Sequence, residues 1–500
     1  MNETLPLLVL GSSFVPGLII FFLHENHRSL RTALNLLGAI VKLALIGYML
    51  WGVLQGEEYI FRYKVLPSID LVLYADSLAM LFVTLSAALW LLTTLYAIGY
   101  LEGSPNRNRF FGFFSLCVTA TIGIAMSGNL FTFFFFYELL TLSTYPLVVH
   151  RGSDQALHAG NVYLTYTLTG GAVLLTGIVW LYGITGNVEF RQGGILYGLD
   201  FYYGVQLRII FLLLIIGVGV KAAIVPLHGW LPKAMVAPAP VSALLHAVAV
   251  VKAGAFGVVR IVYEVYGIEF SSSLNLLAPL AIAASITIIW GSLRAIWQDD
   301  LKRRLAYSTI SQVSYIVLGV ALLGPVATIG GLVHLVHQGI MKITLFFCAG
   351  NFAETLGVHK ISEMNGIGWR MPLSMAAFTL GALGMIGVPM TAGHISKKYL
   401  TEGADLAGME WAHWVLTASG VLNAVYFLPI LYRAWIKRPN VPPDERKPAQ
   451  ERKEAGWLLL APTLFSAAAI VAVALGANSD WSPLYWSKLI ARRQYLYLED

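Results

Sequence analysis

The chain has 500 residues, of which 57% are hydrophobic and 12% charged, and its mean hydropathy is +0.70. Because soluble domains carry about 25% charged residues, this composition excludes a chain built from ordinary soluble domains. One membrane crossing takes about 20 apolar residues, so about fourteen crossings would use most of the apolar content. We therefore predict an all-α polytopic membrane protein with no room for a sizeable soluble domain.

The charge and the cysteines exclude further classes. The net charge is +6, but the basic residues lie between apolar blocks, which is typical of loops that fix membrane orientation rather than of a nucleic-acid surface. The two cysteines, Cys117 and Cys348, each lie inside an apolar run, so we expect neither a disulfide framework nor a metal cluster. No nucleotide-binding loop or haem-attachment motif occurs in the sequence, and we expect no cofactor and no nucleic-acid partner.

Apolar stretches follow one another along the whole chain, and we predict that each crosses the membrane. They cover residues 5–23, 33–54, 77–99, 110–127, 129–149, 161–184, 207–227, 240–263, 274–293, 305–323, 327–353, 373–400, 411–432 and 456–475. The first lacks a basic leader and a small-residue cleavage site, so we expect it to be retained as a span. The two closest pairs are separated at Ser127-Gly128-Asn129 and at Gly324-Pro325.

Lysine and arginine are shared unevenly between the predicted loops. The odd-numbered loops hold 19 of them and the even-numbered loops hold 4. Because basic loops stay in the cytoplasm, this split predicts cytoplasmic odd loops and places both termini on the opposite side. An error in the number of spans would scramble the split, so it supports a count of fourteen.

Ionisable residues inside the apolar stretches are the main functional signal. A charge at mid-membrane costs about 2.5–3.5 kcal/mol on insertion scales, so such residues are expected to pair or to line a hydrated path. The residues concerned are Lys42, Glu138, Lys221, His246, Lys252, His334, His337, Lys342, Lys397 and Lys398.

The surroundings of each residue weigh for or against a functional role. Glu138 is flanked by four phenylalanines and two leucines, so it cannot reach the interface and we expect it to be functional. Lys42 is a lone cation in the second span, where snorkelling to the interface or facing a partner stands beside a functional role. One of Lys397 and Lys398 is expected to reach the interface. Arg260, near the end of its span, is expected to snorkel.

The histidines can be interpreted in more than one way. His334 and His337 are spaced i, i+3, which could supply two metal ligands, but no third or fourth ligand lies nearby in sequence. Lys342 lies about 80° round a helix from His334, so both can border one cavity. A hydrated proton or ion relay fits these groups better than a metal site. His246 could equally be a core histidine.

Helix breakers lie beside two of the lysines. Pro226 follows Lys221, and Gly387 and Pro389 precede Lys397. Broken helices at membrane depth are tolerated where they line a cavity. The breaks fall in the seventh and twelfth predicted spans, and polar residues in the fifth and tenth show the same offset of five. An odd offset reverses orientation, which predicts two inverted five-helix repeats, spans 4–8 and 9–13.

These spans divide the chain into four predicted parts. Residues 1–109 hold the first three spans, 110–266 the first repeat and 267–436 the second repeat. Residues 437–500 hold a solvated cytoplasmic linker, the fourteenth span and a tail. The division is positional, since no residue-level repeat is evident.

Six stretches resemble the antiporter-like subunit family. This family comprises the proton-pumping membrane subunits of respiratory complex I, their hydrogenase relatives and the large subunits of Mrp-type cation/proton antiporters. The stretches are 136–145 with Glu138, 221–234 with Lys221, 239–254 with His246 and Lys252, 298–312, 334–342 with His334, His337 and Lys342, and 393–397 with Lys397. The resemblance runs in order over about residues 70–435.

The resemblance implies a proton path along the centre of the membrane. The path would use, in order, Glu138, Lys221, His246 or Lys252, His334, His337, Lys342 and Lys397. Glu138 would modulate the proton affinity of Lys221. The terminal lysine is similar to that of the Mrp D-type subunit and of the distal complex I subunit; we do not expect the long lateral helix of the latter here. Asn161 and His394 depart from the usual residues, which leaves the route of proton uptake open.

We therefore predict a proton-translocating subunit of a Mrp-like monovalent cation/proton antiporter complex in a prokaryotic cytoplasmic membrane. The alternative is a pumping subunit of a complex I or hydrogenase-type redox complex. A third class, an autonomous membrane enzyme or quinone-binding protein, would need redox ligands or a catalytic nucleophile, and the sequence suggests neither. The expected partners are other membrane subunits, lipid, protons and monovalent cations such as sodium.

Overall fold

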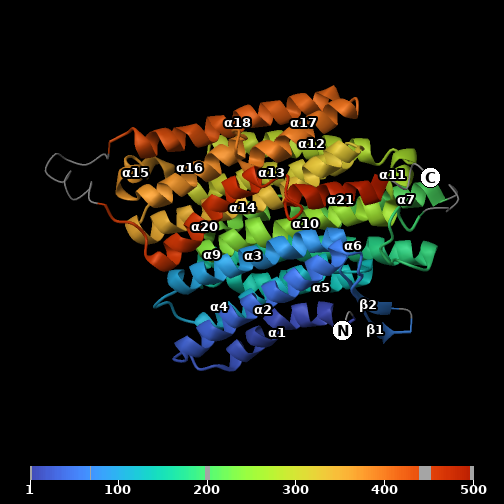
Figure 1. The fold of residues 1–500 in the computed structure, drawn as a ribbon, viewed down its shortest axis with the longest axis horizontal. Coiled ribbons are helices and arrows are strands. Elements are labelled where there is room, and N and C mark those ends of the chain that lie inside the picture. The colour runs from blue at the N-terminus through green and yellow to red at the C-terminus, as the bar shows by residue number, and fades with distance from the viewer. Residues whose placement is uncertain (1–2, 68, 197–202, 439–451, 496–500) are drawn as a thin grey trace.

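The computed structural model describes residues 3–67, 69–196, 203–438 and 452–495. Within these ranges, twelve helices are long and apolar enough to cross a membrane. Figure 1 shows the long helices running side by side along the long axis of the molecule, from α1 at one edge to α18 at the other. The chain is thus a multi-pass helical membrane protein.

The first half of the chain forms the edge that begins with α1. Its helices are α1 (Leu5–Phe22), α2 (Arg28–Leu54), α3 (Ser77–Tyr100), α4 (Arg107–Ala125), α5 (Leu130–Val148), α6 (Asp154–Thr185), α7 (Gly204–Ala222) and the short α8 (Trp230–Lys233). The predicted separation of α4 from α5 is confirmed, because the side chain of Asn129 caps α5 by accepting a bond from the Thr132 amide at 2.7 Å.

A wholly buried helical segment follows at the centre of the bundle. It comprises α9 (Ala239–Ala243), the π-helical turn η3 (Leu244–Val248), α10 (Val250–Arg260) and the π-helical turn η4 (Ile261–Tyr266). The backbone is irregular at Ala249, between η3 and α10, with φ −108° and ψ −86°. Such departures from the α-helix are frequent at functional sites, and here η3 contains His246 and Ala249 lies three residues before Lys252.

The second half packs around this segment on its other side. It comprises α11 (Ile268–Ser273), α12 (Leu277–Ile296), α13 (Leu301–Ala321), α14 (Pro325–Leu356), α15 (Ile367–Arg370), α16 (Pro372–Ile386), α17 (Ala392–Leu406), α18 (Glu410–Trp435), α20 (Trp457–Leu475) and α21 (Pro483–Tyr495), with short 3₁₀ turns at Ala234–Val236 (η2) and Ile361–Glu363 (η5). The polar linker predicted from residue 437 lies mostly outside the described residues.

Two of the fourteen predicted stretches are not among the twelve long apolar helices. Residues 305–323 form most of α13, which is long enough but begins with a basic turn, Lys302-Arg303-Arg304. Residues 373–400 form two helices, α16 and α17, of 15 residues each. They meet at a turn in which Gly387 has φ +101°, a conformation that favours glycine.

A two-stranded hairpin that the sequence analysis did not predict joins α2 to α3. Its strands β1 (Ile60–Leu66) and β2 (Ile69–Tyr74) pair antiparallel, at the opposite end of the bundle from α15 (Figure 1). The Gly128 amide donates to the Val72 carbonyl at 2.9 Å, which attaches the hairpin to the α4–α5 turn. The apolar and aromatic residues of β1 have high strand propensity, but too few lie together to predict a span or a strand.

The break after Lys221 is held against the central segment by a close approach to a glycine. The helix α7 ends at Ala222, and Ala223 adopts the left-handed conformation with φ +57°. A side-chain carbon on Gly254 of α10 would lie 2.6 Å from the Lys221 carbonyl carbon and 2.7 Å from the Val218 oxygen. These are backbone atoms and cannot move aside, so only glycine permits this packing.

Replacing this glycine should therefore displace the end of α7. We expect Gly254→Ala to cost about 1–3 kcal/mol through overpacking, seen as a lower thermal unfolding temperature in detergent. Gly183→Ala in α6 is the matched control, because a side-chain carbon there meets nothing within 4 Å and alanine favours a helix. Equal unfolding temperatures for the two variants would contradict the close approach.

Candidate functional site

Four lysines of the predicted path share one feature: each ammonium group donates to a backbone carbonyl. Lys221, Lys252 and Lys342 are fully buried and Lys397 is partly buried. The carbonyl acceptors belong to Tyr137 for Lys221, Leu335 for Lys252, Leu305 for Lys342, and Met385 and Ile386 for Lys397. Among the described residues, none of the four lies in an ion pair with a carboxylate.

The Glu138 and Lys221 side chains are adjacent but make no direct ion pair. The Lys221 ammonium donates to the Tyr137 carbonyl and lies 3.3 Å from the centre of the Tyr137 ring. The Tyr137 hydroxyl in turn donates to the Gly217 carbonyl at 2.9 Å, which joins α5 to α7. The Glu138 carboxylate instead lies against Gly171 of α6, and its Oε1 is buried without a hydrogen-bond partner. The ammonium is therefore held by Tyr137, while the carboxylate beside it lies against α6.

Lys252 and His246 lie on the central segment, on either side of the irregular Ala249. The Lys252 ammonium donates to the Leu335 carbonyl of α14 at 2.7 Å. The His246 ring stacks on Phe346 of α14 with centroids 4.5 Å apart, and neither ring nitrogen has a hydrogen-bond partner. Both residues thus face α14, the helix that carries His334, His337 and Lys342.

A continuous hydrogen-bonded bridge connects Lys342 to Lys397. Lys342 donates to the Ser308 hydroxyl at 2.6 Å, and Ser308 lies 2.8 Å from the Tyr426 hydroxyl. Tyr426 donates to the Asn423 side-chain oxygen at 2.5 Å. The Asn423 amide donates at 2.9 Å to the Met385 carbonyl, which also accepts from Lys397 at 2.6 Å. The bridge uses side chains of α13 and α18 and ends at the carbonyl end of α16.

His334 provides a second connection to the same lysine. Its Nδ1 lies 2.8 Å from the Ser396 hydroxyl, and Ser396 precedes Lys397 on α17. The His334 ring also stacks on Tyr315, with centroids 5.1 Å apart, and the Lys397 ammonium lies 5.6 Å from the centre of the Tyr315 ring. The imidazole and the terminal ammonium therefore border one polar region.

Buried polar atoms without a protein partner lie along this route. They include both ring nitrogens of His246 and His337, both amide atoms of Gln312 and Gln338, Nε2 of His334 and the Tyr315 hydroxyl. Gln312 lies one helical turn from Ser308, and Gln338 one turn from Lys342. Buried polar atoms normally find partners, and internal water supplies them where the protein does not. The arrangement fits a hydrated path between the lysines.

Two cations are buried inside the bundle: Arg260, for which snorkelling was expected, and Lys42, for which the sequence left the alternatives open. Arg260 does not snorkel: its guanidinium is buried and ion-paired with Asp76, at 2.7 Å, and with Glu264. Asp76 caps the start of α3, so the ion pair ties α10 to α3. Lys42 neither reaches the interface nor faces a partner surface, because its ammonium is buried and donates to Ser13 of α1 at 2.6 Å.

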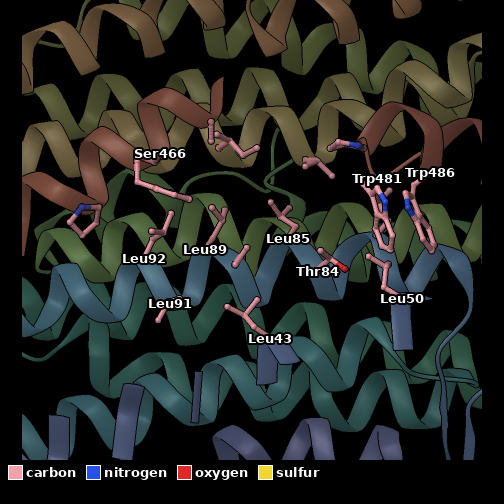
Figure 2. A pocket seen from close by; sticks show the side chains of 18 of the residues that line it. Leu43, Leu50, Thr84, Leu85, Leu89, Leu91, Leu92, Ser466, Trp481 and Trp486 are labelled. Carbon is pink, nitrogen blue, oxygen red and sulfur yellow. The ribbon is translucent and has the colours of Figure 1, made fainter. Parts of the chain in front are cut away.

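Other kinds of site are poorly supported in the described part of the chain. No group of three or more histidine, cysteine, aspartate or glutamate side chains there is arranged to hold a metal ion. A cavity of about 580 Å³ opens beside α3, lined almost entirely by apolar side chains. Figure 2 shows Leu85, Leu89 and Leu92 on its wall, with Trp481 and Trp486 together at one end. None of the residues predicted for the path lines this cavity.

Comparisons with known proteins show the family to which the chain belongs. Residues 127–425 match the family model for the transmembrane region of NADH:quinone oxidoreductases and Mrp antiporters. Residues 67–111 match the model for the N-terminus of complex I chain 5. NADH-quinone oxidoreductase subunit N of Desulforudis audaxviator is 36% identical over 441 residues, which are 84% of this chain and 85% of that protein. The chain belongs to the NADH:quinone oxidoreductase/Mrp antiporter family.

Other relatives differ in how much of their length the chain covers. Na(+)/H(+) antiporter subunit A1 of Staphylococcus aureus is 30% identical over 71% of this chain, and the chain spans 46% of that protein. A chain in the structure of the Mrp complex from Dietzia sp. DQ12-45-1b superposes with a TM-score of 0.86, covering 99% of this chain and 97% of that one. At 23% identity this last likeness shows that the fold is shared.

The sequence did not point to three residues that connect the predicted site residues. Tyr137, Asn423 and Tyr426 are fully buried and hydrogen-bonded between helices. Asn423 and Tyr426 share a face of α18 at i, i+3, and this spacing in an apolar helix was the available signal. Tyr137 gave no such signal, because it continues a run of aromatic residues before Glu138.

Proposed function

We propose that this chain carries protons across the membrane as one subunit of a multisubunit Mrp-like monovalent cation/proton antiporter complex. Membership of the family supports a proton-translocating, antiporter-like role. The observation that carries the proposal is the series of lysines held by carbonyls and bordered by unpartnered buried polar atoms. A carbonyl dipole stabilises an ammonium group but does not fix its charge as a paired carboxylate would.

Proton transfer would begin at Lys221 and end at Lys397. Glu138 follows Tyr137, whose carbonyl accepts from Lys221. A shift of α5 that moves Tyr137 would therefore change the surroundings of the Glu138 carboxylate and the Lys221 ammonium together. Loading a proton on Lys221 would then repel a proton from Lys252, and so on along the series. His246, His334 and His337 would pass protons between the lysines through water.

The bridge from Lys342 to Lys397 would couple the last two steps. Ser308, Tyr426 and Asn423 accept from or donate to one another in sequence, so a change of charge at Lys342 reorients the hydrogen bonds that reach the Met385 carbonyl. That carbonyl holds Lys397. Hydrogen-bond chains polarise cooperatively in a low-dielectric interior, which strengthens such coupling.

The proposed topology has fourteen spans, with α13 and the α16–α17 pair completing the count. Spans 4–8 and 9–13 would form inverted repeats, within the four parts 1–109, 110–266, 267–436 and 437–500. The repeat is supported by a shared arrangement: Lys221 lies in the last turn of α7, and Lys397 donates to the last carbonyls of α16. Carbonyl ends of interrupted helices favour cations. Both termini would lie outside the cytoplasm.

A pumping subunit of a redox complex is the second candidate. The 36% identity to an oxidoreductase subunit over 85% of that subunit's length favours it. The two candidates share the proton path and differ in the partner subunits. Purifying the complex from its native membrane and identifying the other subunits separates them, since flavin and iron–sulfur subunits would contradict the antiporter. The exchanged ion in the antiporter would be a monovalent cation such as sodium, and lipid would surround the outer helices.

The two neighbouring lysines of α17 should differ sharply in importance. Lys397 donates into the end of α16, whereas Lys398 is exposed and pairs with Glu402 at 3.6 Å, an ion pair of little energetic value. We expect Lys397→Ala to slow proton transport roughly tenfold or more and Lys398→Ala to change it little. The rates are to be measured in vesicles that hold equal amounts of assembled complex. The reverse order would show that the terminal site is misassigned.

Removing one hydroxyl from the bridge should uncouple Lys342 from Lys397. Tyr426→Phe keeps the ring but loses both hydroxyl contacts, and we expect proton transport to fall about tenfold. Tyr266→Phe is the control, because its hydroxyl is also buried and makes a single bond, to the Leu207 carbonyl at 2.6 Å, away from the path. If both variants transport protons like the unmodified complex, the bridge has no role.

A further inference from the structure

Lys42 is a buried cation for which the path from Glu138 to Lys397 has no role. It lies near the middle of the 27-residue α2, which otherwise presents mainly apolar residues to the outside of the bundle. Its side chain turns inward and is fully buried between α1, α3 and α4. An ammonium can donate three hydrogen bonds, but here it donates one, to Ser13, and otherwise lies 4.9 Å from the centre of the Trp90 ring.

No charged partner offsets this cation. The helices α1 and α3 carry no charged residue, and α4 carries Arg107 and Arg109 only in its first turn. Within α2 the other charges are Arg28 and Arg31, also in the first turn. A charged group in a membrane interior is costly and is retained where it serves a function. Like the lysines of the path, Lys42 turns inward and makes no ion pair with a carboxylate among the described residues.

Small polar side chains lead from Lys42 to the turn between α1 and α2. Ser13 lies 2.7 Å from the Thr119 hydroxyl, and Thr119 donates to the Ser115 carbonyl at 2.9 Å. Ser115 donates to the Asn35 side chain at 3.4 Å, and Asn35 donates to the Arg31 carbonyl at 3.0 Å. Arg31 contacts Glu25 of the turn at 3.7 Å. This series of contacts extends from Lys42, near the middle of α2, to the α1–α2 turn.

Unpartnered polar atoms also lie along α3, the helix that carries Trp90 beside Lys42. Ser86, Trp90 and Thr94 lie one turn apart on α3, and the side-chain oxygen or nitrogen of each is buried without a hydrogen-bond partner. The helix α3 packs on α2 on one side and on η3, which carries His246, and α14 on the other. Water bound to these atoms would connect Lys42 with the lysine series.

We propose that Lys42 is a further proton-binding site, which exchanges protons with the surface at the α1–α2 turn and feeds the path near His246. The ligand is the proton itself, delivered by water bound to the hydroxyl groups of Ser13, Thr119 and Ser115 and to the side chain of Asn35. This inference rests on the proposed function, since it adds an uptake site to the same path.

The test compares two replacements of Lys42 in the assembled complex, with proton transport measured in inverted membrane vesicles. Methionine removes the charge and preserves an unbranched chain, whereas arginine preserves the charge but does not release its proton. We expect Lys42→Met and Lys42→Arg both to slow transport about tenfold or more. Unchanged transport by the methionine variant, or full transport by the arginine variant, would overturn the proposal. Lys398→Met controls for the loss of a lysine from a membrane helix.

A milder substitution provides a test if the complex that carries Lys42→Arg does not assemble. Ser13→Ala removes the one side-chain acceptor of the ammonium, so the pH profile of transport should shift toward lower pH. The neighbouring Ser12 bonds only the Val9 carbonyl, and Ser12→Ala should leave the profile unchanged. Identical profiles for the two serine variants would also overturn the proposal.

Lys221→Met, measured in parallel, separates this inference from the proposed function. If Lys221→Met stops transport while Lys42→Met does not, only the role of Lys42 fails. If Lys221→Met transports normally, the proton path itself is wrong, and the uptake site that rests on it fails too.

Discussion

The hydrogen bond between a buried ammonium and a backbone carbonyl is the interaction on which the rest of this structure depends. Lys221, Lys252, Lys342 and Lys397 all make it, and none has a carboxylate partner among the described residues. A paired carboxylate would lock the charge in place, and a wholly apolar site would expel it. Carbonyl dipoles lie between these extremes, and the proposed path requires such sites, at which a lysine can exist with or without its proton.

One of the four lysines uses the free end of an interrupted helix, whereas the carbonyls of Tyr137, Leu335 and Leu305 lie within α5, α14 and α13. In a regular helix nearly all carbonyls accept from amides within the helix, and only the last turn leaves them free. The end of α16 provides free carbonyls to Lys397, and the end of α7 places Lys221 at the carbonyl end of its own helix. The central segment is interrupted as well, by the π-helical turn η3 that contains His246 and by the irregular Ala249 before Lys252. Glycine at position 254 lets the helices approach closely enough to hold these breaks together.

Much of the fold was predictable, because a helix that crosses a membrane needs about 20 mostly apolar residues and such stretches are visible in the sequence. The stretches predicted to cross the membrane coincide closely with helices of the structure, and the separation at Asn129 falls where the helix cap lies. The hairpin after α2 was missed, since a few aromatic and branched residues in a loop give no periodic signal. The count of fourteen crossings depends on α13 and the α16–α17 pair, whose polar or broken sequences give weak hydropathy.

The candidate site was predictable as a set of residues but not as a set of contacts. Buried lysines and Glu138 stand out because charges are rare in apolar runs. Their hydrogen-bond partners do not stand out, because Tyr137 and Met385 accept through backbone carbonyls, which every residue has. For the same reason sequence alone could not decide whether Lys42 turns outward or inward. Only the packing of α1 and α3 on α2 fixes it.

The central claim is that water joins the carbonyl-held lysines into one path. The most direct measurement is a high-resolution cryo-electron microscopy map of the assembled complex, examined around Gln312, Gln338, His246 and His337. The account predicts ordered water within hydrogen-bonding distance, about 2.7–3.2 Å, of their unpartnered nitrogen and oxygen atoms. Side chains that pair these atoms directly, with dry apolar packing between Lys252, Lys342 and Lys397, would contradict it.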